Sequence, residues 1–236
     1  MDRVTELCRV FLMHLFVRHH FHLKNLLPAG QLKEIFTTNF DGLEYQLDLP
    51  DSKIIAVHGT LARTRCEFCH REMKSDRFRE LVRSNIKDIS SSDSKPTESS
   101  VILCPNPKCG RAGMKTAFLL YDTNLDEEVL KRMDKSQPQP DLLFVVGTSL
   151  CVEPFSELPS HCPRSVRVVV NRDLPYARCG FEFGNGHDHM WQGNCEEMFF
   201  ALAEKLGWLP DLAQFCDTLP QASKEMLEKA LNKSVT

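Results

Sequence analysis

Four cysteines in two close pairs give the clearest chemical signal in this sequence. Cys66 and Cys69 are separated by two residues, and Cys104 and Cys109 by four. Two such pairs can place four thiolates at the corners of a tetrahedron, which is the arrangement that a structural zinc ion requires. Four thiolates leave no open coordination position, so we expect one structural Zn²⁺ here and any catalysis elsewhere.

A second set of candidate residues follows short apolar runs. The segment Thr37–Glu44 directly follows one run and contains Asn39 and Asp41, and the pair His58 and Gly59 follows another. Ligands of doubly wound folds bind beyond the carboxyl ends of the strands, so these side chains would face a crevice. A histidine there can act as a base, and glycine would let the backbone approach a ligand. The alternatives are an Asx turn that caps a helix and a hydrogen-bonded loop histidine.

Two more polar turns follow apolar runs further along the chain. Gly147, Thr148 and Ser149 form a small, hydroxyl-rich segment that suits a phosphate or a ribose, although such turns also cap helices routinely. Asn171 and Arg172 carry polar groups that can bind ribose hydroxyls. Each turn is a weak signal alone, but several of them at strand ends favour a nucleotide-binding edge.

These residues need a sheet to position them, and several short apolar runs predict its buried parallel strands. Most runs are four or five residues long, several are rich in β-branched residues, and turn residues flank them. They are Ile35–Thr37, Ile54–Val57, Ala117–Tyr121, Leu142–Val146 and Val166–Val170. Their alternation with helices favours an α/β fold with a doubly wound, Rossmann-like parallel sheet.

Four segments have helical signals. Asp126–Met133 has acidic residues in its first turn and basic residues in its last, as the helix dipole favours. Glu196–Leu206 carries an amphipathic stripe, and Ala222–Leu231 predicts a short helix in the tail. The apolar run Val10–Val17 is far shorter than the roughly 20 residues of a membrane helix, so we expect a core helix there.

The composition is that of an ordinary soluble globular protein. The chain has 236 residues, of which 42% are hydrophobic and 26% charged, and its formal net charge is −3. We therefore expect neither direct nucleic-acid binding nor a membrane. No signal peptide is visible, which favours an intracellular location in the nucleus or cytoplasm. The remaining cysteines are expected to be buried free thiols: Cys8, Cys151, Cys162, Cys179, Cys195 and Cys216.

The order of these signals predicts an inserted module within one larger domain. We expect the first part of the Rossmann-like domain at 1–62, a small zinc-binding module at 63–113, the remainder of the domain at 114–209 and a C-terminal tail at 210–236. Within the module, the polar and serine-rich residues 88–100 predict a mobile excursion.

Together these residues resemble the sirtuin family, the NAD-dependent protein-lysine deacylases. The resemblance covers roughly residues 30–209, and seven segments match in order. They are Thr37–Glu44, His58-Gly59, Cys66 with Cys69, Cys104 with Cys109, Gly147–Leu150 with Val152 and Pro154, Val170–Arg172, and Gly193–Glu196 followed by Leu206–Trp208.

The resemblance implies NAD as the cofactor and a role for each matching residue. His58 matches the general base that deprotonates a ribose hydroxyl after nicotinamide has left. The four paired cysteines match a structural zinc site. The implied cofactor-binding residues are Asn39 and Asp41 in the nicotinamide and ribose pocket, Gly147, Thr148 and Ser149 at the ribose and phosphate, Asn171 and Arg172 at the adenosine ribose, and Cys195 at the adenine.

The activity implied by the resemblance is that of a protein-lysine deacetylase or deacylase, an enzyme of the acyltransferase class. Such an enzyme releases nicotinamide and O-acyl-ADP-ribose. Its implied partners are acylated lysine peptides of protein substrates, with histones among the candidates.

The sequence departs from the family pattern in three places. It contains neither the Gly-Ala-Gly-x-Ser turn nor the Pro-Asp-Phe-Arg loop that cradle the pyrophosphate, so we expect an N-terminally incomplete sheet that begins after the first βα unit. Thr38 replaces the family's glutamine, and Leu120–Thr123 replaces the Phe-Gly-Glu substrate loop.

These departures leave a second interpretation open, namely a catalytically impaired, zinc-stabilised binding module or fragment. A plain zinc-ribbon interaction protein would explain the cysteines but not His58, Asn39 or the Gly147 turn. A catalytic zinc hydrolase is disfavoured, because four thiolates close the metal.

Overall fold

The chain forms two compact units. The computed structural model describes residues 10–13, 32–46, 49–87, 98–119, 125–134, 140–175, 179–214, 216 and 221–233. Unit 1 comprises Met1–Asn39, Leu43–Val57 and Leu125–Thr236, and unit 2 comprises Phe40–Gly42 and His58–Asn124.

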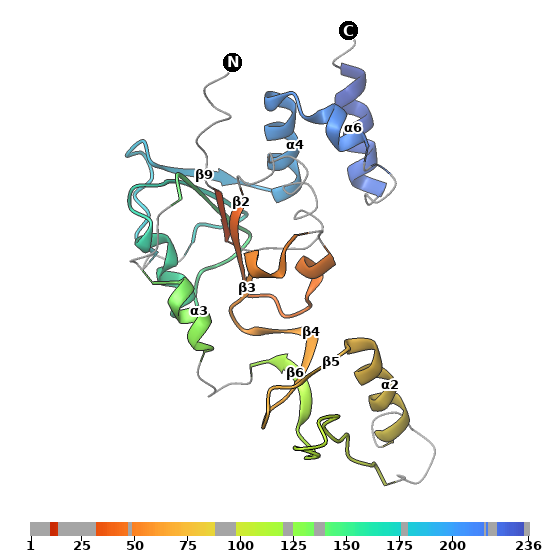
Figure 1. Cartoon of the computed structure of the whole chain (residues 1–236). Helices are drawn as coiled ribbons and strands as arrows, with labels where there is room; N and C mark the ends of the chain where they lie inside the picture. Colours follow the sequence, from red (N-terminus) through yellow and green to blue (C-terminus); the bar gives the residue numbers. More distant parts are fainter. Residues whose placement is uncertain are drawn as a thin grey trace. The chain divides into compact units, whose positions relative to one another are not determined.

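A six-stranded parallel sheet forms the centre of unit 1 (Figure 1). Its strands lie in the order β3-β2-β1-β7-β8-β9, and every neighbouring pair is parallel. The bounds are β1 Val10–Met13, β2 Leu32–Thr37, β3 Ile54–Ala56, β7 Leu142–Val146, β8 Val166–Asn171 and β9 Asp188–Gln192. Counted within the sheet, this is the order 3-2-1-4-5-6 of the Rossmann fold, so the predicted doubly wound parallel sheet is confirmed.

Side chains on the two faces of the sheet enter two separate cores, because successive residues of a strand point to opposite faces. Leu143 and Val145 of β7 join the core on one face, whereas Phe144 and Val146 join the core on the other. The first core includes residues of η3 (Phe155–His161) and packs against α3 (Glu127–Arg132). The second includes Met198 and Phe199 of α4 (Cys195–Leu206). Helical segments therefore cover both faces.

The ends of α4 follow from local capping residues. The Asn194 side chain accepts a hydrogen bond from the backbone N–H of Glu196 at 2.9 Å and so satisfies one of the free donors of the first turn. Gly207 ends the helix at φ 72°, a left-handed conformation that glycine adopts without strain. Helices α5 (Leu209–Ala213) and α6 (Gln221–Lys233) pack with α4 around a third core.

A buried ion pair joins the last two strands of the sheet. Arg167 of β8 donates to both carboxylate oxygens of Asp188 of β9, each at 2.6 Å, and the two side chains are 8% and 0% exposed. Arg167 also donates to the carbonyls of Pro159 and Gly180, and Asp188 accepts the backbone N–H of Glu182. Burial alone would raise the pKa of Asp188, but these hydrogen bonds from Arg167 and Glu182 hold it below its usual value.

Two predictions for the sheet are wrong. The core helix expected at Val10–Val17 is a strand over Val10–Met13, which pairs with both β2 and β7 in the middle of the sheet. A strand therefore occupies the position that the N-terminally incomplete sheet was expected to lack. The strand expected at Ala117–Tyr121 is also misplaced, because β6 (Met114–Phe118) pairs antiparallel with β4 (Gly59–Cys66) in unit 2.

Other predicted elements are confirmed. The strands at Ile35–Thr37, Leu142–Val146 and Val166–Val170 lie within β2, β7 and β8, and the strand expected at Ile54–Val57 is β3, which ends one residue earlier at Ala56. The three predicted helices appear as α3, α4 and α6. Residues 88–97 of the expected serine-rich excursion lie outside the described residues.

The described residues of unit 2 form a small antiparallel sheet in the order β5-β4-β6 and one helix (Figure 1). Phe40 joins this unit, because its carbonyl accepts the N–H of Leu61 at 2.7 Å and its ring lies 4.8 Å from that of Phe118. The zinc-binding module expected at 63–113 lies within the second segment of the unit. The elements are β4 Gly59–Cys66, β5 Glu72–Met73, β6 Met114–Phe118 and α2 Ser75–Asn85.

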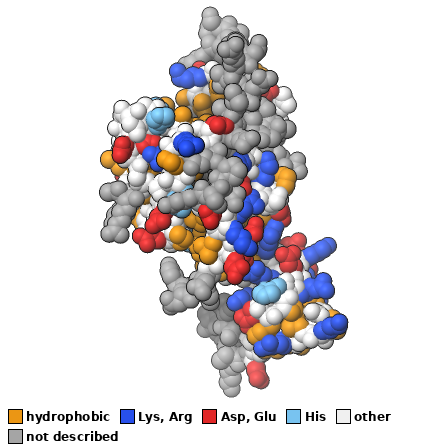
Figure 2. Space-filling model, turned by 60° about the vertical axis from the view of Figure 1, so that its left-hand side comes forward, with side chains coloured by type: hydrophobic (Ala, Val, Ile, Leu, Met, Phe, Trp, Pro, Cys, Tyr) orange, Lys and Arg blue, Asp and Glu red, His pale blue; other side chains and the backbone are white. Residues whose placement is uncertain are grey.

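Acidic and basic side chains are interspersed on the face drawn in Figure 2, in keeping with the small net charge of −3. Among the described residues, no helix has the length and apolar character needed to span a membrane.

Candidate functional site

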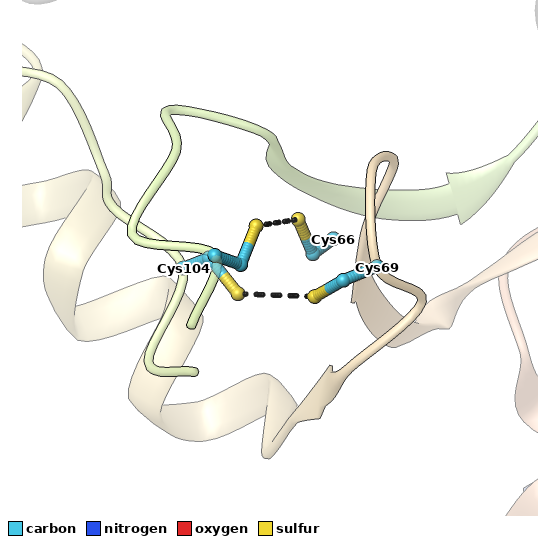
Figure 3. Close-up of side chains that lie close together, drawn as sticks. Cys66, Cys69 and Cys104 are labelled. Carbon is cyan, nitrogen blue, oxygen red and sulfur yellow. Dashed lines mark hydrogen bonds between the residues drawn. The ribbon is translucent and has the colours of Figure 1, made fainter. Parts of the chain in front are cut away.

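The four paired cysteines converge in unit 2. Their four Sγ atoms all lie within 4.8 Å of one another. The Sγ atoms of Cys66 and Cys109 are 3.8 Å apart and those of Cys69 and Cys104 are 3.5 Å apart (Figure 3). Zinc bound tetrahedrally with Zn–S distances of about 2.3 Å requires sulfurs about 3.8 Å apart. The donor set therefore fits a structural zinc ion.

Two tight backbone turns bring the cysteines together. After β4, the N–H of His70 donates to the carbonyl of Cys66 at 2.9 Å, and His70 has a φ of 56°. In the second turn, the N–H of Asn106 points at the sulfur of Cys104 at 3.4 Å, and its side-chain amide points at that of Cys69 at 3.6 Å. Such N–H donors around the sulfurs stabilise thiolates, as the surroundings of metal ligands commonly do.

The thiols differ in acidity before a metal binds. Burial raises the pKa of Cys104 to about 12, whereas a backbone hydrogen bond at Arg71 lowers that of Cys69 to about 6. Zinc needs all four sulfurs as thiolates, so its binding would release protons, chiefly from the more buried cysteines.

The carboxyl ends of β7 and β8 bring two of the predicted cofactor turns together in unit 1. Gly147 has a φ of 54°, and its N–H donates to the carbonyl of Val170 at 2.7 Å. The side-chain amide of Asn171 donates to the carbonyl of Thr148 at 3.1 Å, and its oxygen accepts the N–H of Arg172 at 3.0 Å. Both ends of the Asn171 amide are thus engaged within the protein, so Asn171 holds the two turns against each other.

The Gly147 turn continues through a residue in an uncommon conformation. Leu150 has a φ of 51° although it has a branched side chain, which is 1% exposed. Its N–H donates to the hydroxyl of Thr148 at 3.2 Å, and its carbonyl accepts the thiol of Cys179 at 3.6 Å. The turn is therefore fixed from both sides, which leaves Ser149 in a defined position between them.

Cys195 lies at the first residue of α4, beyond the carboxyl end of β9. Its thiol donates to the carbonyl of Val170 at 3.6 Å, and burial raises its pKa. The side chain is therefore a neutral packing group that ties α4 to β8. This leaves the backbone of the Gly193–Glu196 turn as the part suited to a ligand, at a helix N-terminus.

The carboxyl end of β2 carries a buried hydrogen-bonded chain. The hydroxyl of Thr37 donates to Oε1 of Glu44 at 2.5 Å and accepts the backbone N–H of Asn39 at 3.1 Å. Thr37 and Glu44 are both 0% exposed. Sequence reasoning gave Glu44 no role, because an acidic residue is usually exposed and the burial of Glu44 is visible only in the structure.

His58 and Asp41 belong to unit 2, whereas Asn39 belongs to unit 1. Burial lowers the pKa of His58 below 6.5, so the imidazole is neutral near pH 7. A neutral imidazole is the form that can accept a proton. Asp41 is exposed, and Thr38 is half-buried.

Gly59 has a structural function that the sequence did not indicate. It adopts a φ of 72°, and a Cβ atom there would lie 1.9 Å from the carbonyl oxygen of Ala117 on β6. The missing side chain therefore admits the neighbouring strand, directly beside His58.

The remaining cysteines only partly match the prediction of buried thiols. Cys162 and Cys179 are buried, but Cys151 is exposed, and Cys195 and Cys216 are half-buried. Cys8 lies outside the described residues, as does Leu120–Thr123, the segment that stands in place of the family's substrate loop.

Comparison with known proteins identifies relatives over most of the chain. Residues 5–154 match the sequence model of the Sir2 family. The NAD-dependent protein deacetylase hst2 of Schizosaccharomyces pombe is 28% identical over 203 residues, which cover 84% of this chain and 54% of that protein. The NAD-dependent protein deacetylase sirtuin-2 of Danio rerio is 27% identical over 216 residues, which cover 83% and 52%.

Solved structures share the fold. A structure described as Sir2Tm bound to a propionylated peptide has a TM-score of 0.58 at 19% identity and covers 81% of this chain and 71% of its own. A structure described as Sir2-p53 peptide-NAD+ has a TM-score of 0.56 at 21% identity and covers 80% and 70%. The chain spans about half the length of the curated relatives it matches, at 54% for the first of them. The family model matches more than half of the sequence, and this match establishes that the chain belongs to the Sir2 family.

Proposed function

We propose that this chain is an NAD-dependent protein-lysine deacylase that releases nicotinamide and O-acyl-ADP-ribose. The observation that carries the proposal is the edge formed in unit 1 by the carboxyl ends of β7 and β8. There a Sir2-family chain holds Gly147, Thr148 and Asn171 together by hydrogen bonds. In doubly wound sheets this edge is where nucleotides bind.

The described residues fit the adenosine half of NAD. Gly147 presents no side chain and a left-handed backbone, which leaves room for a ribose or phosphate beside Thr148 and Ser149. The start of α4 at Cys195 offers backbone N–H groups, and Arg172 offers a cation next to the ribose position. When bound, NAD would supply an electrophilic ribose carbon to the acyl oxygen of the substrate lysine.

His58 would take a proton from a ribose hydroxyl. Its pKa is lowered by burial, so it is unprotonated at neutral pH and available as a base. Asn39 and Asp41 would line the nicotinamide and ribose pocket. The proposed zinc ion at the four cysteines would hold unit 2 folded and take no part in the chemistry, because four thiolates fill its coordination sphere.

Two kinds of relatives support acyl-lysine peptides as substrates. The curated relatives are named protein deacetylases, and the solved structures include complexes with a propionylated peptide and with a p53 peptide. Histones are among the candidate protein substrates.

Nicotinamide release in the presence of NAD and an acetyl-lysine peptide tests the proposal. We expect turnover by the wild-type chain, a loss of at least about 100-fold in His58→Ala because a general base contributes this much or more, and no change in His70→Ala. His70 is a matched control, because it is an exposed histidine of the same unit. Wild-type turnover no higher than that of His58→Ala would reject the proposal.

The second candidate function is that of a zinc-stabilised binding module without turnover. The observation in its favour is that the sequence contains no Gly-Ala-Gly-x-Ser turn to cradle the pyrophosphate. Losing two or three charge-assisted hydrogen bonds of about 1.5–3 kcal/mol each would weaken NAD binding by two or more orders of magnitude. Calorimetry separates the two candidates, since micromolar binding of NAD favours the enzyme.

A further inference from the structure

The segment that follows β2 contains a buried carboxylate, Glu44, to which the sequence analysis assigns no role. Glu44 lies in the first turn of η1 (Leu43–Gln46) and is 0% exposed. Burying a carboxylate is costly unless hydrogen bonds compensate for the lost water. Glu44 receives such a bond from Thr37, which is also 0% exposed.

The hydroxyl of Thr37 has a single proton, and its direction decides what the oxygen can do. The proton is donated to Oε1 of Glu44 at 2.5 Å, and the oxygen can accept only through its lone pairs. The backbone N–H of Asn39 donates to this oxygen at 3.1 Å. A hydrogen bond to a carboxylate polarises the hydroxyl and strengthens the second bond in the chain.

The other side of Thr37 is fixed by the sheet. Its carbonyl accepts the N–H of Val57 at 2.8 Å, directly after β3. The backbone of β2 is thus positioned by strand pairing up to Thr37, and two residues later the N–H of Asn39 is bonded to the Thr37 hydroxyl. Asn39 is the residue expected to line the nicotinamide pocket. The hydrogen bond from its N–H to the Thr37 hydroxyl therefore bears on the geometry of that pocket.

We infer that Glu44 is a positioning residue, which acts through the hydroxyl of Thr37 to set the backbone of Asn39. This inference rests on the proposed function for the role of Asn39 in the pocket. The hydrogen-bonded chain itself lies within unit 1 and requires no ligand.

Amide hydrogen exchange of the full chain without ligand tests the inference. The measured quantity is the protection of the Asn39 N–H relative to that of Val57, which reports the pairing of β2. In Glu44→Gln and in Thr37→Val we expect this ratio to fall at least about tenfold, whereas Thr37→Ser, which keeps the hydroxyl, should stay within about threefold of wild type. Glu44→Gln replaces the charged acceptor by a neutral one, whereas Thr37→Val removes the hydroxyl itself, so the second variant answers the question if Glu44→Gln does not fold.

Thr60→Val is the matched control. The hydroxyl of Thr60 accepts the N–H of Ala62, two residues later, at 3.0 Å. This is the same kind of bond as that between Thr37 and Asn39, but it lies in unit 2. Thr60→Val should leave the protection of the Asn39 N–H relative to that of the Val57 N–H unchanged. The inference is overturned if Asn39 and Val57 lose protection together in the Glu44 and Thr37 variants, or if neither changes, because either result would make the carboxylate a purely structural group.

Nicotinamide release provides a second readout. If Glu44 positions Asn39, the turnover number of Glu44→Gln at saturating NAD should fall about tenfold while Thr37→Ser retains wild-type turnover. A wild-type chain that releases no nicotinamide would reject the proposed function, yet the exchange experiment would still decide the role of Glu44.

Discussion

Replacing Asp188 by asparagine should destabilise unit 1 strongly, because it leaves a buried cation without its partner. Asp188 accepts two hydrogen bonds of 2.6 Å from Arg167, whose side chain is only 8% exposed. Asparagine has nearly the same shape but can accept only one of these bonds, and its amide would face the guanidinium. Breaking a buried pair in this way costs about 3–5 kcal/mol.

Urea unfolding followed by far-UV circular dichroism measures this loss of free energy, and thermal unfolding followed by the same signal measures the melting temperature. At roughly 2–4 °C per kcal/mol for a protein of this size, the melting temperature should fall by about 6–20 °C. Arg77→Leu is the control, because it removes the exposed pair Arg77–Glu80, whose side chains are 63% and 64% exposed. We expect that control to cost less than about 1 kcal/mol.

The difference between wild type and Asp188→Asn should also depend on pH. The folded pKa of Asp188 is depressed, so its stabilising effect is fully present above its unfolded pKa of about 3.9 and is lost as the pH falls through the folded value. The two proteins should therefore converge in stability below about pH 4. A cost for Asp188→Asn no larger than that of Arg77→Leu, or a constant difference down to pH 2, would refute the reasoning.

Three further predictions concern unit 2. Metal analysis should find about one zinc per chain, lost in Cys66→Ser but retained in Cys151→Ser, which removes an exposed thiol. The rate of nicotinamide release should rise with pH to a plateau, with a midpoint below 6.5, because burial lowers the pKa of His58; a midpoint above 7 would contradict this. Gly59→Ala should unfold unit 2 or lower its melting temperature far more than Gly110→Ala, since both glycines have positive φ but only Gly59 faces backbone at 1.9 Å.

Elements with strong local signals could be predicted from the sequence. The β-branched runs at β7 and β8, the amphipathic stripe of α4 and the spacing of the cysteines depend on neighbouring residues alone. Elements defined by distant partners could not. Val10–Met13 pairs with a strand on each side, and its unbroken apolar run has the same appearance as a buried helix. Strand β9 was missed because Asp188–Gln192 is polar, as befits an edge strand.

The candidate site divides in the same way. Residue types at strand ends indicated where Thr148 and Asn171 would lie, because the carboxyl ends of parallel strands share one edge. The bond between them joins residues 23 apart, and no local pattern encodes it. The hydrogen-bonded chain from Glu44 through Thr37 to Asn39 joins residues no more than seven positions apart, but its significance depends on burial, which the sequence does not display.

The boundary between the two units has a consequence for protein engineering. Unit 2 is encoded in two pieces, Phe40–Gly42 and His58–Asn124, so the chain crosses the boundary four times. Deleting the longer piece would remove two partners of Phe40. These are the N–H of Leu61, which donates to the Phe40 carbonyl, and the ring of Phe118. Unit 2 therefore cannot be exchanged between relatives as one continuous segment, and a graft must also include the three-residue piece Phe40–Gly42.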